Sequence, residues 1–477
     1  MVTETAVPRY HLITYGCQMN KNDSERAEAL LKGIGFASAE TPEEADFILI
    51  NSCSVRQTAE DRIFGQMKNF AALREQKPDL LLGVTGCMPG RDRDGKLRAK
   101  LPMVDFFFPI SDLPQLPRWL AEHAPTLVKT TDAPEDYLKI TPSRRSVRQS
   151  FVTIQTGCNK FCTYCVVPFS RGLEKNRSVA DILVEVRDLA DHGCVEVTLL
   201  GQTVNAYKAT DPETFSQDNP YKDHFAALLW EVHQVAGIER MHYTAPHPIH
   251  MTDEAIDALA LPKHVRFIHL PVQAGSNDVL RRMNRRYTRE FYLDLVKKIR
   301  ARVPDIALGT DIIVGFAGET AEQFAETASL YQAADFDISY TAQYSPRTGT
   351  AAFRAFPDTV TREEKKERWN TLQKLMEEIV LKKNQALIGK TVRVLVETVE
   401  PMKPFDAAPI RGSEDPSGSR RQDGNNASRV IAEGNCEYMK RVRFSVGELG
   451  SAAIGQFFDV KITKAREWIL EGEVVGE

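Results

Sequence analysis

Three cysteines occur within eight residues of the segment GCNKFCTYCVVPFSRG, which spans 157–172. They are Cys158, Cys162 and Cys165, with the spacing C-x3-C-x2-C. Three thiols are too few for two disulfides, and a structural zinc site takes four ligands. Iron–sulfur clusters take closely spaced thiolates, normally four for a [4Fe–4S] cube, so three would leave one iron open to bind and activate another molecule. Zinc completed by a distant His or Cys remains the alternative at this point.

Three further cysteines follow apolar segments near the N-terminus. Cys17 comes after 10–16, Cys53 after 46–52 and Cys87 after 80–86, and each segment has the composition of a β-strand. The intervals between them suit one strand and one helix each. Because ligands bind at the carboxyl edge of a parallel sheet, we expect the three thiols to converge there. The alternative is three buried cysteines that pack as small apolar side chains.

Composition indicates a soluble globular protein of several domains. The chain has 477 residues, 42% of them hydrophobic and 26% charged, with a formal net charge of −4. The N-terminus lacks the pattern of a signal or transit peptide, and no apolar run is long enough to cross a bilayer. A cytoplasmic protein without a membrane partner is expected, so its eight cysteines favour metal ligation over disulfides. Cys194 and Cys436 match no motif and are expected to be unligated.

The chain divides into three blocks and a linker. Residues 8–125 alternate strand and helix patterns and predict a parallel α/β domain, and 126–150 form a polar, Pro-punctuated linker. Residues 151–386 contain six strand–helix units in series, which predict a partial (β/α)6 barrel closed by a long helix over 362–387. Residues 387–477 alternate in β fashion and predict a small β-barrel, interrupted by a polar insert over 401–428. The expected fold class is therefore α/β with a C-terminal β-barrel.

The cysteine triplet resembles the cluster loop of the radical S-adenosylmethionine (SAM) superfamily. With Thr163 and Tyr164 between the last two cysteines, the motif is C-x3-C-x-aromatic-C, and it follows the first barrel strand as in that superfamily. The resemblance implies a [4Fe–4S] cluster whose open iron binds the amino and carboxylate groups of SAM. One electron then cleaves SAM to give a radical. Tyr164 would lie along the adenine, and SAM would replace the missing fourth cysteine.

The whole chain resembles the methylthiotransferases within that superfamily. These enzymes join a three-cysteine N-terminal domain, a radical SAM core and a C-terminal TRAM domain. The segments YGCQMN, NSCSVR, LLGQTVNAY and RRMNRRYTRE look most like the MiaB-type tRNA methylthiotransferases. Three positions depart from the usual family residues, Ala317 in GFAGET, Thr203 in GQTVN and Thr348 in PRTGT, and they put loop rigidity in doubt more than chemistry.

The resemblance implies a function and its cofactors. Cys17, Cys53 and Cys87 would hold a second [4Fe–4S] cluster, where a sulfur species binds. The substrate would be the N6-isopentenyladenosine 3′ to the anticodon, position 37 of tRNA, methylthiolated at C2. The partners would be tRNA, an electron donor such as flavodoxin or ferredoxin, and a sulfur source, with the enzyme a monomer. Alternatives are methylthiolation of threonylcarbamoyl-adenosine or of a ribosomal protein aspartate, or a non-catalytic iron–sulfur protein that binds RNA.

No catalytic residue is predicted beyond the cluster ligands, but several polar residues follow the predicted barrel strands on the expected active face. The candidates for binding SAM or substrate are Tyr164, Arg177, Gln202, Asn205, His247, Gln273 and Asp311. Arg171 and Arg177 could also meet a SAM carboxylate or a tRNA phosphate. For each residue a structural role, such as loop capping or an ion pair, is the competing interpretation.

Three groups of basic residues could bind tRNA. They are Arg144, Arg145 and Arg148 in the linker, Arg281, Arg282, Arg285, Arg286 and Arg289 in RRMNRRYTR, and Lys440, Arg441 and Arg443 in the C-terminal block. Tyr287 adds a surface on which a base could stack. Charge runs are more often solvated faces than binding sites, and that interpretation remains open. An anticodon loop suits this route, since its unpaired bases can splay into a pocket.

Overall fold

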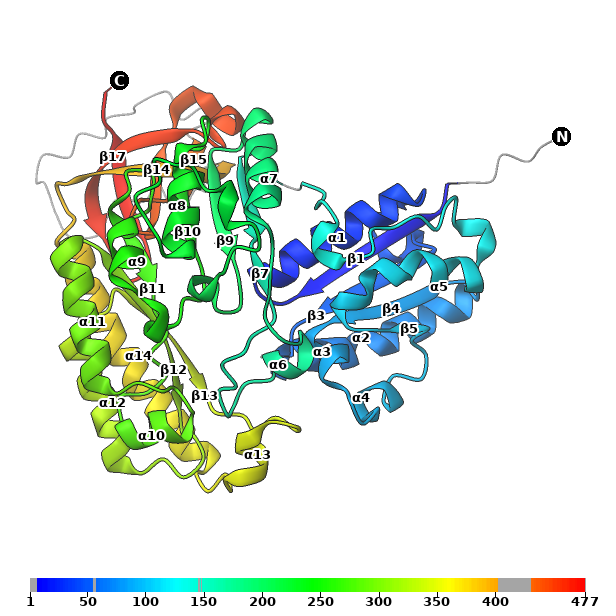
Figure 1. The fold of residues 1–477 in the computed structure, drawn as a ribbon, viewed down its shortest axis with the longest axis horizontal. Helices are drawn as coiled ribbons and strands as arrows, with labels where there is room; N and C mark the ends of the chain where they lie inside the picture. Colours follow the sequence, from blue (N-terminus) through cyan, green and yellow to red (C-terminus); the bar gives the residue numbers. More distant parts are fainter. Residues whose placement is uncertain (1–6, 55–56, 145, 147, 402–429, 477) are drawn as a thin grey trace, which may run out of the picture.

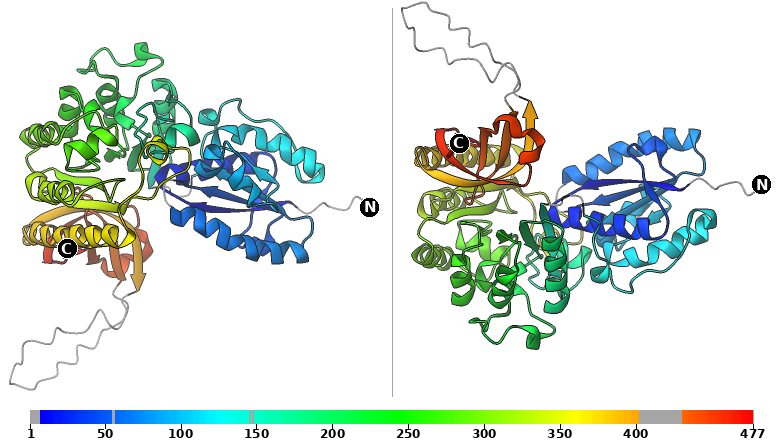
Figure 2. Two further views of the ribbon diagram at one scale, coloured as in Figure 1. Left: turned by 90° about the horizontal axis from the view of Figure 1, so that it is seen from below. Right: turned by 90° about the horizontal axis from the view of Figure 1, so that it is seen from above.

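The computed structural model describes residues 7–54, 57–144, 146, 148–401 and 430–476. An N-terminal α/β domain lies beside a larger α/β core, and a small β-barrel stacks on the core (Figures 1 and 2). The N-terminal domain and the core are joined by the segment that leads into the first core strand. In the part of the chain that the structure describes, no helix is both long and apolar enough to cross a membrane.

The N-terminal domain is built on a five-stranded, all-parallel sheet in the order β2-β1-β3-β4-β5. Its strands are β1 (Arg9–Tyr15), β2 (Ala37–Ser38), β3 (Phe47–Ser52), β4 (Leu81–Gly86) and β5 (Phe106–Phe107). Its helices are α1 (Gln18–Gly33), α2 (Gln57–Gln76), α3 (Cys87–Arg91), α4 (Lys96–Ala99) and α5 (Leu116–His123). The three predicted strands are the central ones. The two-residue edge strands are too short to leave a periodic pattern.

Every residue of β3 is buried because helices cover both faces of this sheet. Phe47 and Leu49 pack toward α1 and α5, and Ile48 and Ile50 pack toward α2. Successive side chains of a strand point to opposite faces, so a strand covered on both sides reads as a continuous apolar run. The run FILIN therefore predicts a central strand, which is where the structure has it.

The core contains six parallel strands in two groups of three neighbours, β10-β9-β6 and β11-β12-β13. These are β6 (Gln149–Thr153), β9 (Glu196–Leu200), β10 (Arg240–Tyr243), β11 (Phe267–His269), β12 (Ala307–Val314) and β13 (Ile338–Gln343). The helices are α6 (Val167–Ser170), α7 (Val179–Asp191), α8 (His224–Gln234), α9 (Asp253–Asp257), α10 (Asn277–Arg282), α11 (Arg289–Arg302), α12 (Ala321–Ala334), α13 (Ala351–Ala355) and α14 (Arg362–Gln385). A short antiparallel ribbon joins β7 (Gln155–Thr156) to β8 (Lys175–Asn176) around the cysteine triplet. The predicted partial (β/α)6 barrel is confirmed.

The C-terminal block is a closed five-stranded barrel in the order β14-β15-β16-β18-β17. Its strands are β14 (Thr391–Pro401), β15 (Val430–Asn435), β16 (Arg441–Ser445), β17 (Phe457–Ala465) and β18 (Leu470–Val474). The alternating segments KTVRVLVETV, RVRFSV, QFFDVKITKA and WILEGEVV predict β14, β16, β17 and β18, whereas β15, which begins where the polar insert ends, is not predicted. From residue 402 onward, the predicted insert lies outside the described residues. Asn384 of α14 donates to the carbonyl oxygens of Arg466 and Glu467 and so fixes the barrel on the core.

The N-terminal domain docks on the core through α1 and α3. Asn22 of α1 donates to the Phe151 carbonyl at 3.2 Å and accepts from the Thr153 hydroxyl at 2.8 Å, so α1 follows the edge of β6. A Cβ at Gly90 of α3 would lie 2.0 Å from the carbonyl oxygen of Ser170 in α6. Only glycine allows this approach, which brings the helix that begins at Cys87 against the helix that follows Cys165.

Candidate functional site

The cysteine triplet lies in the loop between β7 and α6, at the carboxyl end of the first core strand. Backbone N–H groups of Lys160 and Val167 point at the sulfur atoms of Cys158 and Cys165, each at 3.5 Å. The Arg285 guanidinium donates to Cys162 Sγ at 3.4 Å, and Thr203 Oγ1 lies 3.3 Å from Cys158 Sγ. Each sulfur therefore has a polar neighbour, as thiolate ligands of iron–sulfur clusters do.

The donor set of the triplet fits an iron–sulfur cluster. None of the eight cysteines, all of which are described, forms a disulfide. Burial, together with the neighbouring Cys162, raises the pKa of Cys165 to about 12, and burial also raises the pKa of Cys158. Such thiols stay protonated unless a cationic centre takes the place of the proton. Within the described residues, no three Cys, His, Asp or Glu side chains are already grouped as ligands of one metal ion.

The segment 282–287 forms hydrogen bonds to the loop that carries the cysteine triplet. Thr163 donates two hydrogen bonds to this segment. Its backbone N–H donates to the Met283 carbonyl, and its hydroxyl donates to the Arg282 carbonyl. Asn284 Nδ2 donates to the Phe161 carbonyl at 3.0 Å. Phe161 and Asn284 both have positive φ, 51° and 59°, a conformation that is uncommon for residues other than glycine and is better tolerated by Asn than by Phe. The RRMNRR motif thus holds the cysteine loop in place.

The prediction that Arg285 binds RNA is wrong. Its side chain is buried, with donations to Cys162, to the Tyr287 hydroxyl at 2.9 Å and to the Pro271 carbonyl at 2.9 Å. A guanidinium in that position cannot reach a phosphate outside the protein. Tyr287 is also buried and packs edge-on against His247, so it offers no exposed stacking face. The sequence signal for burial was the pair Met283 and Tyr287, two large apolar side chains that interrupt the basic run.

The second set of thiols lies where β1, β3 and β4 end side by side. Tyr15 pairs with Ser52 and Ser52 with Gly86, and Cys17, Cys53 and Cys87 follow those residues within two positions. Gly86 has φ of 98° and a Cβ there would lie 2.5 Å from the Ser52 carbonyl, so glycine permits the turn into Cys87. The topology therefore brings the three cysteines to one edge of the sheet, as expected from their spacing.

A buried amide network holds the Cys17 turn. Asn20 Oδ1 accepts from the Cys17 backbone and lies 3.4 Å from its Sγ, and Asn20 Nδ2 donates to Asn51 Oδ1 at 3.0 Å. Asn51 in turn donates to the Ser24 hydroxyl at 3.0 Å. Asn20 and Asn51 are completely buried, so their hydrogen bonds fix the start of α1 against the end of β3.

Arg171 of the core reaches the second set of thiols. Its Nε donates to Cys87 Sγ at 3.3 Å and its Nη2 pairs with Asp23 of α1 at 2.5 Å. The side chains of Arg171 and Asp23 are 1% and 0% exposed, and the Tyr137 hydroxyl donates to the same carboxylate. Although burial opposes the charge, Asp23 and Cys87 raise the pKa of Arg171 well above its ordinary value. Sequence reasoning missed Asp23, whose only signal was an acid in a helix directly after a candidate ligand.

A second arginine of the core, Arg347, lies close enough to Cys53 to be influenced by its charge. It lies in the loop after β13 and donates to the Gln57 side chain at the start of α2. Burial lowers its pKa, while Glu60 and Cys53 act in the opposite direction. Arg91 forms a buried pair with Glu60 at 2.8 Å, which also accepts from the Ser54 hydroxyl beside Cys53. Arginines of the core and of the N-terminal domain thus surround this edge of the sheet.

Two of the predicted SAM-binding residues, Arg177 and Asn205, are engaged by other parts of the protein. Arg177 pairs with Glu185 at 2.6 Å and donates to the Thr153 carbonyl, so its guanidinium supports the first strand. Asn205 brackets the backbone of His247, donating to its carbonyl and accepting from its N–H. Both therefore have structural partners, the competing interpretation raised for them above.

The remaining predicted residues lie around the cluster loop or at strand ends. Tyr164 is half-buried against the core, and Gln202 is half-buried after β9. Burial and the Arg285 charge lower the pKa of His247 to about 2. Gln273 has φ of 78° and its backbone pairs with β12. Asp311 is half-exposed, and its carboxylate lies 3.1 Å from His269 Nε2.

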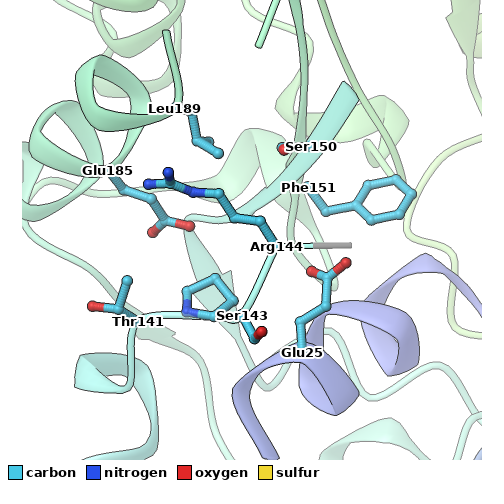
Figure 3. A pocket seen from close by; sticks show the side chains of 9 residues that line it. Glu25, Thr141, Ser143, Arg144, Ser150, Phe151, Glu185 and Leu189 are labelled. Carbon is cyan, nitrogen blue, oxygen red and sulfur yellow. The ribbon is translucent and has the colours of Figure 1, made fainter. Parts of the chain in front are cut away.

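Many of the predicted RNA-binding cations have protein partners. Arg144 extends toward Glu185 and Leu189 of α7 in a small cavity (Figure 3) and pairs with Asp188. Arg281 pairs with Asp278, and Arg282 donates to the Ala317 carbonyl and to Gln323. Lys440, Arg441 and Arg443 pair with Asp337, Glu397 and Glu433.

The other predicted cations differ in how far they are engaged. Arg148 and Arg286 are exposed, and Arg289 donates to the Glu326 carbonyl. Arg145 lies outside the described residues. Contact of the exposed members with RNA stays a prediction.

Comparisons with known proteins follow the same division of the chain. Residues 152–331 match the Radical SAM superfamily, and residues 9–109 match the uncharacterized protein family UPF0004. The chain is similar to a radical SAM methyltransferase, TsrM from Kitasatospora setae, with a TM-score of 0.54 and 13% identity over 73% of this chain and 74% of that one. At this identity the likeness concerns the fold.

Curated relatives cover most of the chain. A tRNA-2-methylthio-N(6)-dimethylallyladenosine synthase of Caldicellulosiruptor saccharolyticus is 43% identical over 81% of this chain and 82% of its own length. Proteins of the same name from Thermoanaerobacter sp. and Geobacillus kaustophilus are each 39% identical over 98% of this chain, and over 92% and 82% of their own lengths.

Proposed function

The chain belongs to the tRNA-2-methylthio-N(6)-dimethylallyladenosine synthase family of radical SAM methylthiotransferases, and from this premise we propose that it methylthiolates C2 of N6-isopentenyladenosine at position 37 of tRNA. One observation carries the proposal. Two sets of three cysteines lie on elements that pack together, since α3 begins at Cys87 and contacts α6, which begins two residues after Cys165. An enzyme that transfers a sulfur group by radical chemistry needs its two reactive centres close to one substrate.

We propose that Cys158, Cys162 and Cys165 hold one [4Fe–4S] cluster with SAM, and that Cys17, Cys53 and Cys87 hold a second. When bound, these groups supply one-electron and sulfur-transfer chemistry, which an adenine C–H bond requires because it is neither acidic nor electrophilic. The protein orients and encloses them. The N–H groups of Lys160 and Val167 and the Arg285 guanidinium point at the first set of sulfurs. Arg171 serves Cys87 in the second set.

The remaining assignments are also part of the proposal. Tyr164, Gln202 and Gln273 lie at the carboxyl ends of core strands or in the cluster loop, where a bound SAM would be within reach. The proposal also includes the domain boundaries given above and a content of two clusters. Its expected partners are an electron donor such as flavodoxin or ferredoxin and a sulfur source, and the enzyme is proposed to be a cytoplasmic monomer. Six cysteines in two sets support two clusters more directly than they support a single one.

The test is mass spectrometry of tRNA nucleosides from the source organism with this gene deleted. We expect 2-methylthio-N6-isopentenyladenosine to disappear and its unthiolated precursor to accumulate, and complementation with the intact gene to restore the product. A plasmid encoding Cys158→Ala serves as the matched control and should not restore it. An unchanged nucleoside would contradict the substrate assignment and direct attention to threonylcarbamoyl-adenosine or a ribosomal protein aspartate.

A further inference from the structure

A cavity of about 490 Å³ lies at the junction of the N-terminal domain and the core. Its walls come from α2, the α3–α4 segment, α6 and the loop that leads into α13. Three of these elements begin close to proposed cluster ligands: α2 four residues after Cys53, α3 at Cys87 itself, and α6 two residues after Cys165. The cavity is therefore walled by elements that lead away from both sets of thiols. Its size is within the range of about 300–1,000 Å³ that ligand sites occupy.

The cations around this cavity are not all neutralised. Within the cavity wall, Glu60 pairs with Arg91, Asp94 pairs with Lys96, and the Asp92 carboxylate accepts from the backbone at the start of α4. Three exposed cations remain, Arg93 and Lys100 from the N-terminal domain and Arg354 from the core, and none has an ion pair with a described residue. They line one cavity from two domains. A polyanion is the chemical class that such a group of unpaired cations attracts.

Apolar and aromatic surface lies between these cations. Phe64 of α2 and Phe169 of α6 are half-buried in the wall, next to Val166. The Arg93 guanidinium lies over the Phe169 ring, 5.3 Å from its centroid. Cationic groups that track a backbone, alternating with aromatic faces on which bases stack, are the features by which proteins bind single-stranded nucleic acid. A duplex has its bases paired and would leave the aromatic wall unused.

We propose that this cavity receives an unpaired nucleotide of the anticodon loop of the substrate RNA, with its base against Phe64 and Phe169 and with Arg93, Lys100 and Arg354 on the neighbouring phosphates of the loop. The inference rests on the proposed function, because it takes tRNA as the substrate. None of the three cations belongs to the basic groups that the sequence singled out. Arg354 lies 254 residues after Lys100 in the sequence, and the fold alone brings these segments to one cavity.

The experiment measures binding of a fluorescein-labelled anticodon stem-loop RNA to the reconstituted full-length enzyme by anisotropy, over a series of salt concentrations. The test variant is Arg93→Gln/Lys100→Gln/Arg354→Gln, which keeps the polar stems. The matched control is Lys297→Gln/Lys298→Gln, two exposed lysines of α11 that pair with Asp294 and Asp253. Iron content and melting temperature confirm that each variant is folded and loaded.

We expect the triple variant to bind roughly tenfold more weakly near 0.1 M salt and to lower the slope of log K against log[salt] by about 2, at about 0.7 per lost phosphate contact. The lysine control should match wild type. If the triple variant bound the RNA as tightly as the wild type, the proposed docking site would be wrong but the proposed function would stand. If the wild type itself did not bind the RNA, both the docking site and the proposed function would be overturned. An equal loss for a blunt duplex would overturn the assignment to the loop.

Discussion

Replacing Arg171 by methionine tests whether the core controls the second set of thiols. The substitution keeps much of the side-chain length and removes the charge from both Asp23 and Cys87. Both members of the Arg171–Asp23 pair are fully buried, so Asp23 would be left as an uncompensated charge that, among the described residues, keeps only the Tyr137 hydroxyl as donor. Removing one partner of such a pair costs about 3–5 kcal/mol. For a domain of about 150–250 residues, this loss of stability lowers the melting temperature by roughly 6–20 °C.

A double-mutant cycle with Asp23→Asn separates charge pairing from general damage. The neutral amide removes the stranded charge, so Arg171→Met/Asp23→Asn should lose less stability than the two single variants added together. We expect a coupling free energy of about 2–3 kcal/mol, in the range found for residues in direct contact. Thermal unfolding of the cluster-free protein, followed by circular dichroism, measures it.

The hydrogen bond to Cys87 gives a second readout that stability alone would not move. In a background with Cys158, Cys162 and Cys165 changed to alanine, iron loading and redox titration followed by electron paramagnetic resonance report on the N-terminal thiols. A donor and a positive charge beside a sulfur favour the reduced cluster, so Arg171→Met should lower its potential. Arg171→Met with wild-type melting, wild-type iron content and an unchanged potential would refute the reasoning.

The remaining predictions concern the two thiol sets, the domain contact and pH. Cys158→Ala should abolish SAM cleavage under reducing, anaerobic conditions, whereas Cys53→Ala should retain cleavage and lose methylthio transfer; equal loss of both activities in the Cys53 variant would contradict the division of roles. Gly90→Ala should loosen the docking of α3 on α6, because its Cβ would lie 2.0 Å from the Ser170 carbonyl, and limited proteolysis at the domain junction should speed up at least severalfold; wild-type cleavage would show that the contact is dispensable. Burial lowers the pKa of His247 to about 2, whereas in the unfolded chain this histidine takes up a proton below about pH 6.5. The free energy of unfolding should therefore decrease as the pH is lowered below 6.5, by up to about 1.4 kcal/mol per pH unit. His247→Gln should flatten that part of the stability curve, and an unchanged slope would assign it to other groups.

Local sequence patterns were sufficient for most of the architecture. The run FILIN predicts a strand covered on both faces, and the long polar–apolar repeat over 362–387 predicts α14, because strand and helix periods are set by the backbone alone. The two-residue edge strands and β15 escaped prediction. The former are too short to show a period, and the latter begins directly after a polar insert.

The candidate ligands were predictable for the same reason, but their surroundings were not. Six cysteines stand at fixed distances from strands that the sequence itself reveals, so their convergence follows from parallel topology. The partners of those cysteines come from distant segments: Arg285 contacts Cys162 across 123 residues, and Arg171 contacts Cys87 across 84.

The sequence by itself determined which thiols this protein places at strand ends, because spacing along a strand–helix repeat is a local property. It did not determine which arginines serve those thiols and which remain exposed, because basic residues look alike until the fold buries some of them. RRMNRR carries four arginines within six residues, yet packing turns Arg285 inward beneath the cysteine loop and leaves Arg286 exposed. That choice depends on desolvation and on partners far away in the chain, and only the tertiary structure decides it.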